Sequence, residues 1–126
     1  MEFKEKKSIY IQIADHFSDN ILKGIWQKED RIPSVREMAV QLEVNPNTVM
    51  RAYAHLQDKS VIYNRRGIGY FVTPEAEKEV KAMKKEDFMN HTLPEFYKLI
   101  KLLDIDMKEL TQGYKEFLKQ EEHHEE

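Results

Sequence analysis

The side chains of this sequence that are best suited to chemistry are the amides, hydroxyls and guanidinium groups of residues 45–67. An asparagine amide can form two hydrogen bonds to a base edge, and the methyl group of threonine can contact that of thymine. Arginine beside glycine suits a loop whose backbone must approach a phosphate chain closely. The chemistry that this combination favours is recognition of a nucleic acid. The candidate residues from this pattern are Asn45, Asn47, Thr48, Arg51, His55, Arg65, Arg66 and Gly67.

Simpler roles remain open for several of these residues. Asn45 and Asn47 can serve only as a turn residue and a helix cap, or they can cap and read bases at once. Arg65 and Arg66 can form a merely solvated turn, because basic pairs are common on protein surfaces.

The charge of the chain is unevenly distributed, although its net value is −3. Residues 1–73 contain 11 basic and 9 acidic residues, whereas residues 74–126 contain 9 and 14. Within residues 45–72 four basic residues accompany a single acid, Asp58. A phosphate backbone responds to the local field, so we expect this segment to face nucleic acid and the acidic second half to stay away from it.

Enzymatic and metal chemistry find little support in the sequence. The absence of cysteine excludes disulfides, thiolate metal sites and cysteine nucleophiles. We find no glycine-rich phosphate loop and no activated-serine motif, and Asp104 and Asp106 lie two apart in an expected loop. His123 and His124 could suggest a metal site, but a frayed acidic tail is the simpler interpretation. We therefore expect no enzyme, no cofactor and no metal.

The sequence also bears on location. No apolar run approaches the ~20 residues that span a bilayer, so no membrane partner is expected. Residues 1–7 lack the apolar segment of a signal peptide. The expected location is the cytoplasm.

Hydrophobic periodicity predicts two helices ahead of the candidate residues. The first covers residues 9–23, with Ser8 as its cap and Gly24 closing it in a left-handed conformation. The second covers residues 34–42, where the spacing of Ser34 and Glu37 is that of a capping box.

A third helix and a hairpin carry the candidate residues themselves. After a tight turn plugged by Val44, the third helix runs from Pro46 or Asn47 to Lys59. Residues 61–64 and 69–72 then form two short strands around a glycine-containing turn. This order is that of a winged helix-turn-helix, in which the second helix braces the third within the major groove and the wing lies beside the duplex.

The buried face of the third helix is predicted to consist of Val49, Ala52, Tyr53 and Leu56. Tyr53 is assigned to the core, and contact with a base is the alternative.

The second half is predicted to be helical, so the fold class is mainly α with a small β wing. Residues 75–91 carry few apolar residues and are expected to form an exposed linker helix, with a kink or restart near Thr92 because Pro94 follows. Asp106 and Glu109 resemble a capping box for a last helix. The expected regions are a winged helix over residues 1–73, a helical region over residues 74–120 and a frayed acidic tail over residues 121–126.

The apolar residues of this second half predict dimerisation. Two helices with apolar stripes cannot bury both faces alone, and a second copy would cover them. A cavity for an effector between the helices is the alternative. The candidate dimerisation residues are Phe88, Leu93, Phe96, Tyr97, Ile100, Leu103, Leu110, Tyr114 and Phe117.

Three segments in this order resemble the GntR family of bacterial regulators: residues 32–39, residues 44–53 and residues 65–72. The resemblance covers about residues 8–73 and implies a DNA-binding transcription regulator. It implies that Arg36 contacts phosphate beside the groove and that Arg66 and Gly67 lie at the wing tip, near the minor groove. With Ser34, these complete the candidate DNA-binding residues.

One position departs from the family pattern. Many members carry a basic residue where Met50 stands, whereas here the charge lies one position later, at Arg51. The sequence leaves open which of the two faces DNA.

The short second half resembles the YtrA-like subfamily, which carries a two-helix dimerising appendage. The resemblance implies a homodimer on a palindromic double-stranded operator, acting as a repressor of an operon that can encode an ABC transporter. An effector is left open. The alternative function is a winged-helix adaptor that binds protein partners and little or no DNA.

Overall fold

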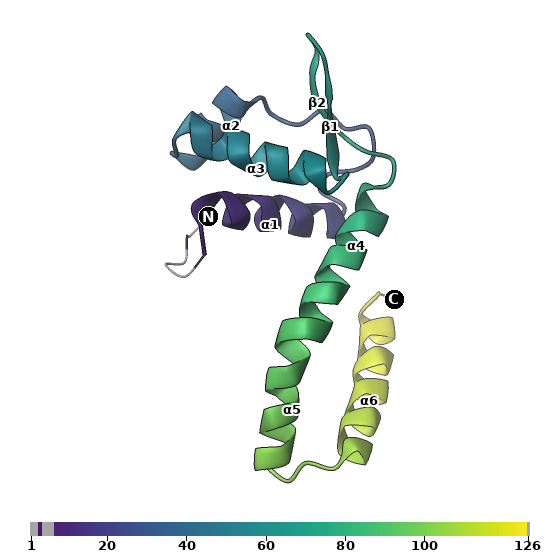
Figure 1. The fold of residues 1–126 in the computed structure, drawn as a ribbon. Coiled ribbons are helices and arrows are strands. Elements are labelled where there is room, and N and C mark those ends of the chain that lie inside the picture. Colours follow the sequence, from purple (N-terminus) through teal and green to yellow (C-terminus); the bar gives the residue numbers. More distant parts are fainter. Residues whose placement is uncertain (1–2, 4–6, 126) are drawn as a thin grey trace. The chain divides into compact units, whose positions relative to one another are not determined.

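The computed structural model describes residue 3 and residues 7–125, which form two compact units, Met1–Lys84 and Lys85–Glu126. Figure 1 follows the chain through both units, and each is described by itself. The mainly helical fold with a two-stranded wing confirms the predicted class. The first unit ends at Lys84, eleven residues beyond the expected boundary at residue 73.

Three helices open the first unit, and the third, α3, packs against both of the others (Figure 1). α1 spans Ile9–Leu22, α2 spans Val35–Leu42 and α3 spans Pro46–Asp58. Gly24 has φ +79°, so the left-handed closure predicted after α1 is confirmed. The prediction for Ser8 is wrong in part, because it occupies the N-cap position of α1 but its side chain forms no capping hydrogen bond.

The helix-turn-helix between α2 and α3 forms as its sequence requires. The Glu37 amide donates to Ser34 Oγ over 3.1 Å, which satisfies one of the free N–H groups of the first turn of α2. Glu43 follows the helix with φ 55°, so the chain reverses in a left-handed residue. Val44 then packs on the core, as predicted for the residue that plugs the turn.

The wing is a hairpin of β1 (Ile62–Arg65) and β2 (Gly69–Val72), paired antiparallel with Ile62 opposite Val72. The chain between α1 and α2 adds a further edge to β2, which the sequence did not predict. Ile32 donates to the Tyr70 carbonyl over 3.0 Å, and Arg31 forms a β-bridge with Phe71. The base of the wing is therefore held on both sides of β2.

The core of the first unit includes the start of α4 (Ala76–Asp87), which corrects the expectation of an exposed linker helix. Ala76 is 2% exposed and Val80 is 0% exposed, because both side chains pack into the core that the three helices and the wing form. Lys84 adds an ion pair with Asp19 of α1 at 2.9 Å. Two apolar residues are enough to attach this helix when they fill an opening in an existing core.

The second unit contains a π-helical segment, η1 (Phe88–Thr92), followed by α5 (Leu93–Leu102) and α6 (Met107–Glu125). α6 runs back in the direction opposite to α5 (Figure 1). The kink or restart predicted near Thr92 is wrong in form, because the chain stays helical there and widens into a π turn just before Pro94. A proline ring clashes with the carbonyl four residues earlier, and widening the preceding turn relieves that clash.

The ends of α6 differ in how well they were predicted. The predicted capping box is confirmed, since the Lys108 amide donates to Asp106 Oδ1 over 3.0 Å and the Asp106 amide donates to Glu109 Oε2 over 3.3 Å. The expected frayed tail is wrong for residues 121–125, which continue α6, while residue 126 lies outside the described residues. Glutamate is a good helix former, and the two histidines of the last turn lie at the helix end that favours positive charge.

Candidate nucleic-acid interface

The first turn of α3 separates a capping asparagine from a free one. Asn45 is the N-cap, and its Oδ1 accepts the Asn47 amide over 2.8 Å. The side-chain amide of Asn47 is exposed and has no hydrogen-bond partner within the described part of the chain. Pro46 occupies the first turn, where a missing N–H costs nothing. Asn47 therefore keeps a complete set of donors and acceptors for an external partner.

Tyr53 fixes the opposite face of α3 in the core. It is 1% exposed, and its hydroxyl donates to the Pro33 carbonyl over 2.7 Å. Its ring meets that of Tyr70 edge-on, with the centroids 5.0 Å apart. Burial is the main reason that the pKa of Tyr53 lies well above its usual range, and nearby Tyr70 and Glu37 add to this. The assignment of Tyr53 to the core is confirmed.

Arg51 and His55 lie toward α1 instead of projecting freely. The Arg51 guanidinium lies over the Tyr10 ring, 4.2 Å from its centroid. The His55 ring meets the same tyrosine edge-on at 6.2 Å. Met50, the residue that precedes Arg51, is 55% exposed. The two residues that the sequence left open as DNA contacts therefore differ in their surroundings, since the Arg51 guanidinium lies over Tyr10 and more than half of Met50 is exposed.

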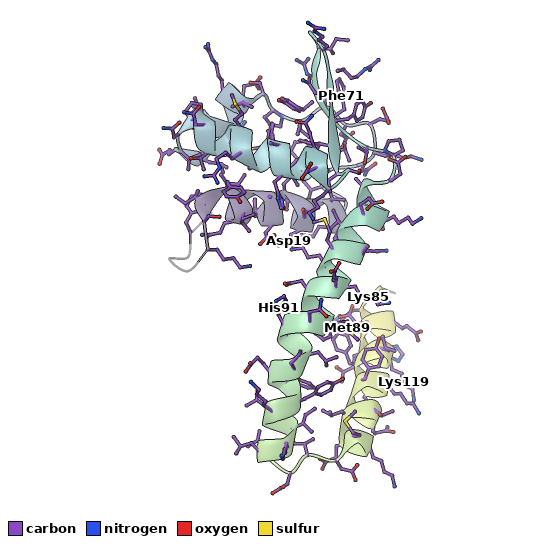
Figure 2. All side chains as sticks on the ribbon, in the orientation of Figure 1. Asp19, Phe71, Lys85, Met89, His91 and Lys119 are labelled. Atoms are coloured by element: carbon purple, nitrogen blue, oxygen red, sulfur yellow. The ribbon has the colours of Figure 1, made fainter. Side chains whose placement is uncertain are left out.

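The wing presents its own basic group. The Arg65 guanidinium lies 5.3 Å from the centroid of the Phe71 ring, which Figure 2 shows on the hairpin. Arg66 and Gly67 form the turn, and Gly67 has φ +77°, a conformation that favours glycine. The Ile68 amide closes the turn by donating to the Arg65 carbonyl over 2.8 Å. Both arginines are exposed at a turn of defined geometry.

A fifth arginine, Arg31, belongs with this group and was not predicted. It is exposed, and its Nε lies 3.2 Å from where a Cβ of Gly69 would be, so a side chain at residue 69 would displace it. Gly69 also has φ +142°. The glycine in the second strand could have signalled a close approach, but the sequence does not tell which side chain approaches.

All five arginines of the chain lie within residues 31–66 of the first unit. Among the described residues, every ion pair uses lysine or histidine as its cation, and none uses arginine. Ser34 and Arg36 lie at the start of α2, where Ser34 is occupied with capping and Arg36 is exposed. Within the part of this unit that the structure describes, the guanidinium groups therefore have no carboxylate partners to displace before they bind an anion.

The apolar residues of the second unit lack a core of their own. None of its described side chains is buried, and Leu93, Ile100 and Leu110 are only half-buried. Several exposed members were not among the predicted dimerisation residues, including Met89 of η1, which Figure 2 labels. The large apolar side chains that are 43–75% exposed here are Phe88, Met89, Phe96, Tyr97, Leu99, Leu102, Leu103, Met107, Tyr114, Phe117 and Leu118.

Two negative findings apply to the described residues. None of their helices is long and apolar enough to cross a membrane. They also contain no group of three histidine, cysteine, aspartate or glutamate side chains that could hold a metal ion.

Three helices with a tight turn between the second and third, followed by a basic hairpin, define a winged helix-turn-helix DNA-binding protein. The chain belongs to the GntR family, since the family model described as "Bacterial regulatory proteins, gntR family" matches residues 9–72. It is therefore a transcription regulator of that family.

The relatives of the chain agree with this assignment. The HTH-type transcriptional regulator YhcF of Bacillus subtilis is 35% identical over 116 residues, which cover 92% of this chain and 94% of YhcF. The HTH-type transcriptional repressor YtrA of the same organism is 41% identical over 68 residues, covering 54% of this chain and 52% of YtrA.

Solved structures agree as well. A GntR-family regulator from Bacteroides thetaiotaomicron is 45% identical, with a TM-score of 0.76 over 90% of this chain and 99% of that one. The DNA-binding domain of AraR in complex with its operator ORR3 is 25% identical, with a TM-score of 0.53 over 58% of this chain and 88% of that one.

Proposed function

We propose that the chain is a dimeric repressor that binds operator DNA through its first unit and pairs with a second copy through its second unit. The observation that carries the DNA-binding part is the set of five arginines on a winged helix-turn-helix, none of which pairs with a carboxylate of the described residues. The AraR domain, which shares this fold, was solved on operator DNA. A regulator of this kind would act in the cytoplasm, where bacterial DNA lies.

Each element of the first unit has a role in this proposal. Asn47 and Thr48, at the start of α3, read base edges in the major groove, where an asparagine amide suits adenine. Arg36 and His55 contact phosphates, and these contacts fix the register of the protein on the duplex. Ser34 and Asn45 hold the starts of α2 and α3, whose first backbone amides can also approach phosphate.

The wing completes the contact. Arg65 and Arg66 lie beside the duplex near the minor groove, and Gly67 lets the backbone come close. Arg51 supplies charge from its place over Tyr10, at the edge of the reading face of α3.

The second unit supplies the dimer. Its exposed apolar side chains would be covered by the same surface of a second copy, as two-fold symmetry requires. A symmetric dimer places two recognition helices on the two halves of a palindromic operator. The repressor role rests on likeness to YtrA, a named repressor, and an operon encoding an ABC transporter is a plausible target by resemblance.

The test is binding of the full chain to double-stranded DNA selected from a random pool. Replacing Arg65 and Arg66 with alanine should weaken binding at least tenfold and reduce its salt dependence by about two phosphate contacts. The matched control replaces Lys115 and Lys119, two exposed lysines of α6, with alanine, and should bind as the original chain does. Binding that the wing substitutions leave unchanged would contradict the DNA-binding role of the wing, whereas a chain that enriches no sequence from the pool would favour the adaptor that recognises protein partners instead.

A further inference from the structure

The outward face of α3 is electrically neutral at its centre. The buried face of the helix consists of Val49, Ala52, Tyr53 and Leu56. At 3.6 residues per turn, Asn47 and Ala54 lie on the side opposite these residues, flanked by Met50 on one side and Arg51 on the other, so that Asn47, Met50 and Ala54 are the three neutral side chains of this face. All three are exposed, and Met50 exposes 55% of its surface. The face that a winged helix turns toward bases thus presents an amide, a thioether and a methyl group.

Arg51 is also exposed at this face, but its guanidinium lies beside Tyr10. Its guanidinium lies 4.2 Å from the centroid of the Tyr10 ring, and a contact of this kind holds a cation to the aromatic face. Tyr10 belongs to α1, and His55 meets the same ring from one turn further along α3. The cation is therefore drawn toward α1, whereas Met50 lies about 100° away around the helix.

The chemistry of the neutral face selects one kind of base pair. Guanine is recognised mainly by two donors from arginine or lysine, and neither Asn47, Met50 nor Ala54 is a cation. Adenine pairs with an asparagine amide, and the thymine methyl group needs only an apolar contact. Methionine suits that contact because its side chain is unbranched and adapts to irregular surfaces.

We propose that Met50 is a specificity-determining residue that packs on a thymine methyl group, and that with Asn47 it directs α3 to adjacent A·T pairs. Residues 47 and 50 are separated by about 4.5 Å along the helix axis, which is comparable to the spacing of one or two base pairs. The inference rests on the proposed function and adds to it the bases read in each half-site.

The experiment removes the methyl group from the DNA. Duplexes bound by the full chain are selected from a random pool, and each thymine of the selected sequence is replaced in turn by uracil. The dissociation constant is then measured for the original chain, Met50→Ala and Met50→Leu. We expect uracil at one or two positions in each half-site to weaken the original chain about fourfold, the effect of one buried methyl group.

The variants assign that effect to Met50. The uracil effect should disappear in Met50→Ala and persist in Met50→Leu, which keeps an apolar side chain of similar size. Selection with Met50→Arg should replace thymine–adenine by a guanine-containing pair at the same position.

Three outcomes would overturn the proposal, and they are distinguishable. If no sequence is enriched and no duplex is bound, the proposed function itself fails. If an operator is bound but uracil weakens the original chain and Met50→Ala equally, DNA binding stands and the role of Met50 is wrong. Selected half-sites with guanine or cytosine at every position sensitive to residue 50 would also contradict it.

Discussion

At the scale of single residues, Tyr53 connects the parts of the first unit that must act together. From α3 it donates a hydrogen bond to the Pro33 carbonyl, just before α2, and it packs edge-on against Tyr70 of β2. Tyr53, which holds the buried side of α3 in the core, thus also contacts the chain just before α2 and the wing. A buried hydroxyl with a single partner of this kind has a measurable energetic role.

Replacing Tyr53 with phenylalanine should lower the free energy of unfolding by about 1 kcal/mol at pH 7, because the Pro33 carbonyl loses its partner. Urea denaturation followed by circular dichroism measures this change. Tyr97→Phe is the matched control, since Tyr97 is 54% exposed and should change stability little. A Tyr53→Phe chain as stable as the original would contradict the assigned role.

The same variant should change how stability depends on pH. The pKa of Tyr53 is raised above its ordinary value of 10.0, mainly by burial, so the folded state holds this proton longer than the unfolded state does. The associated stability is present below pH 10 and is lost as the pH rises toward the folded-state pKa. Tyr53→Phe should therefore lose less stability between pH 9 and pH 11 than the original chain. Tyr63, whose pKa is raised by its hydrogen bond to Glu29, titrates in both chains and does not affect the comparison.

Residue types and spacing predicted much of the candidate site, and what they missed has a common cause. The cap position of Ser34 and the buried face of α3 followed from local rules, because their partners lie within four residues, whereas the sequence left open whether Asn45 or Asn47 would cap α3. Arg51 on Tyr10 and Arg31 on Gly69 did not, because each pair joins residues 38 to 41 positions apart in the chain. Contacts between distant segments depend on the packed fold and leave no periodic trace in the sequence.

At the scale of elements, α4 shows that a helix with few apolar residues can still pack into a core. Its sequence is dominated by lysine and glutamate, which is why an exposed linker was expected. Val80 is nevertheless fully buried in the core of the first unit, and Met83 packs against that core. A helix added to an existing core needs few apolar residues, so counting them underestimates its attachment.

Replacing Val80 with alanine should destabilise the first unit by about 2 kcal/mol, the cost of removing two buried methyl carbons and leaving a small cavity. Thermal denaturation measures the loss. Val40→Ala in α2 is the matched control, because it makes the same change at a side chain that is 78% exposed. An equal effect of the two substitutions would mean that the start of α4 is not part of the core of the first unit.

The conformation of two further segments, η1 and the chain between α1 and α2, was not predicted. Pro94 predicted a kink or restart of the helix, but the sequence could not show that the helix would continue through a π turn instead. The segment between α1 and α2 has no strand pattern, yet residues 29–32 pair with β2. Its pairing depends on where the wing folds, which is a property of the assembled unit.

At the scale of the whole molecule, the two units differ in charge and in burial. The second unit holds 6 basic and 11 acidic residues, whereas the first holds 14 and 12. The first unit has a complete core, but none of the described side chains of the second is buried. An isolated pair of amphipathic helices is marginal in water, which supports the proposal that the second unit is covered by a second copy. Its acidic charge keeps that surface from competing for DNA.

The last prediction separates assembly from DNA contact. Leu103→Glu and Phe117→Glu each place a charge among the exposed apolar side chains of the second unit. Leu103 is 62% exposed and Phe117 is 54% exposed. Each should convert a dimer into a monomer in sedimentation velocity, because an unpaired charge within an apolar interface is costly. Operator affinity should fall about a hundredfold or more, since a monomer loses the effective concentration that the second half-site provides.

Gln120→Glu adds the same charge at an exposed position of α6 and should remain dimeric. The Arg65→Ala and Arg66→Ala double variant should show the converse, a dimer that has lost DNA, and an original chain that sediments as a monomer would refute the proposed assembly.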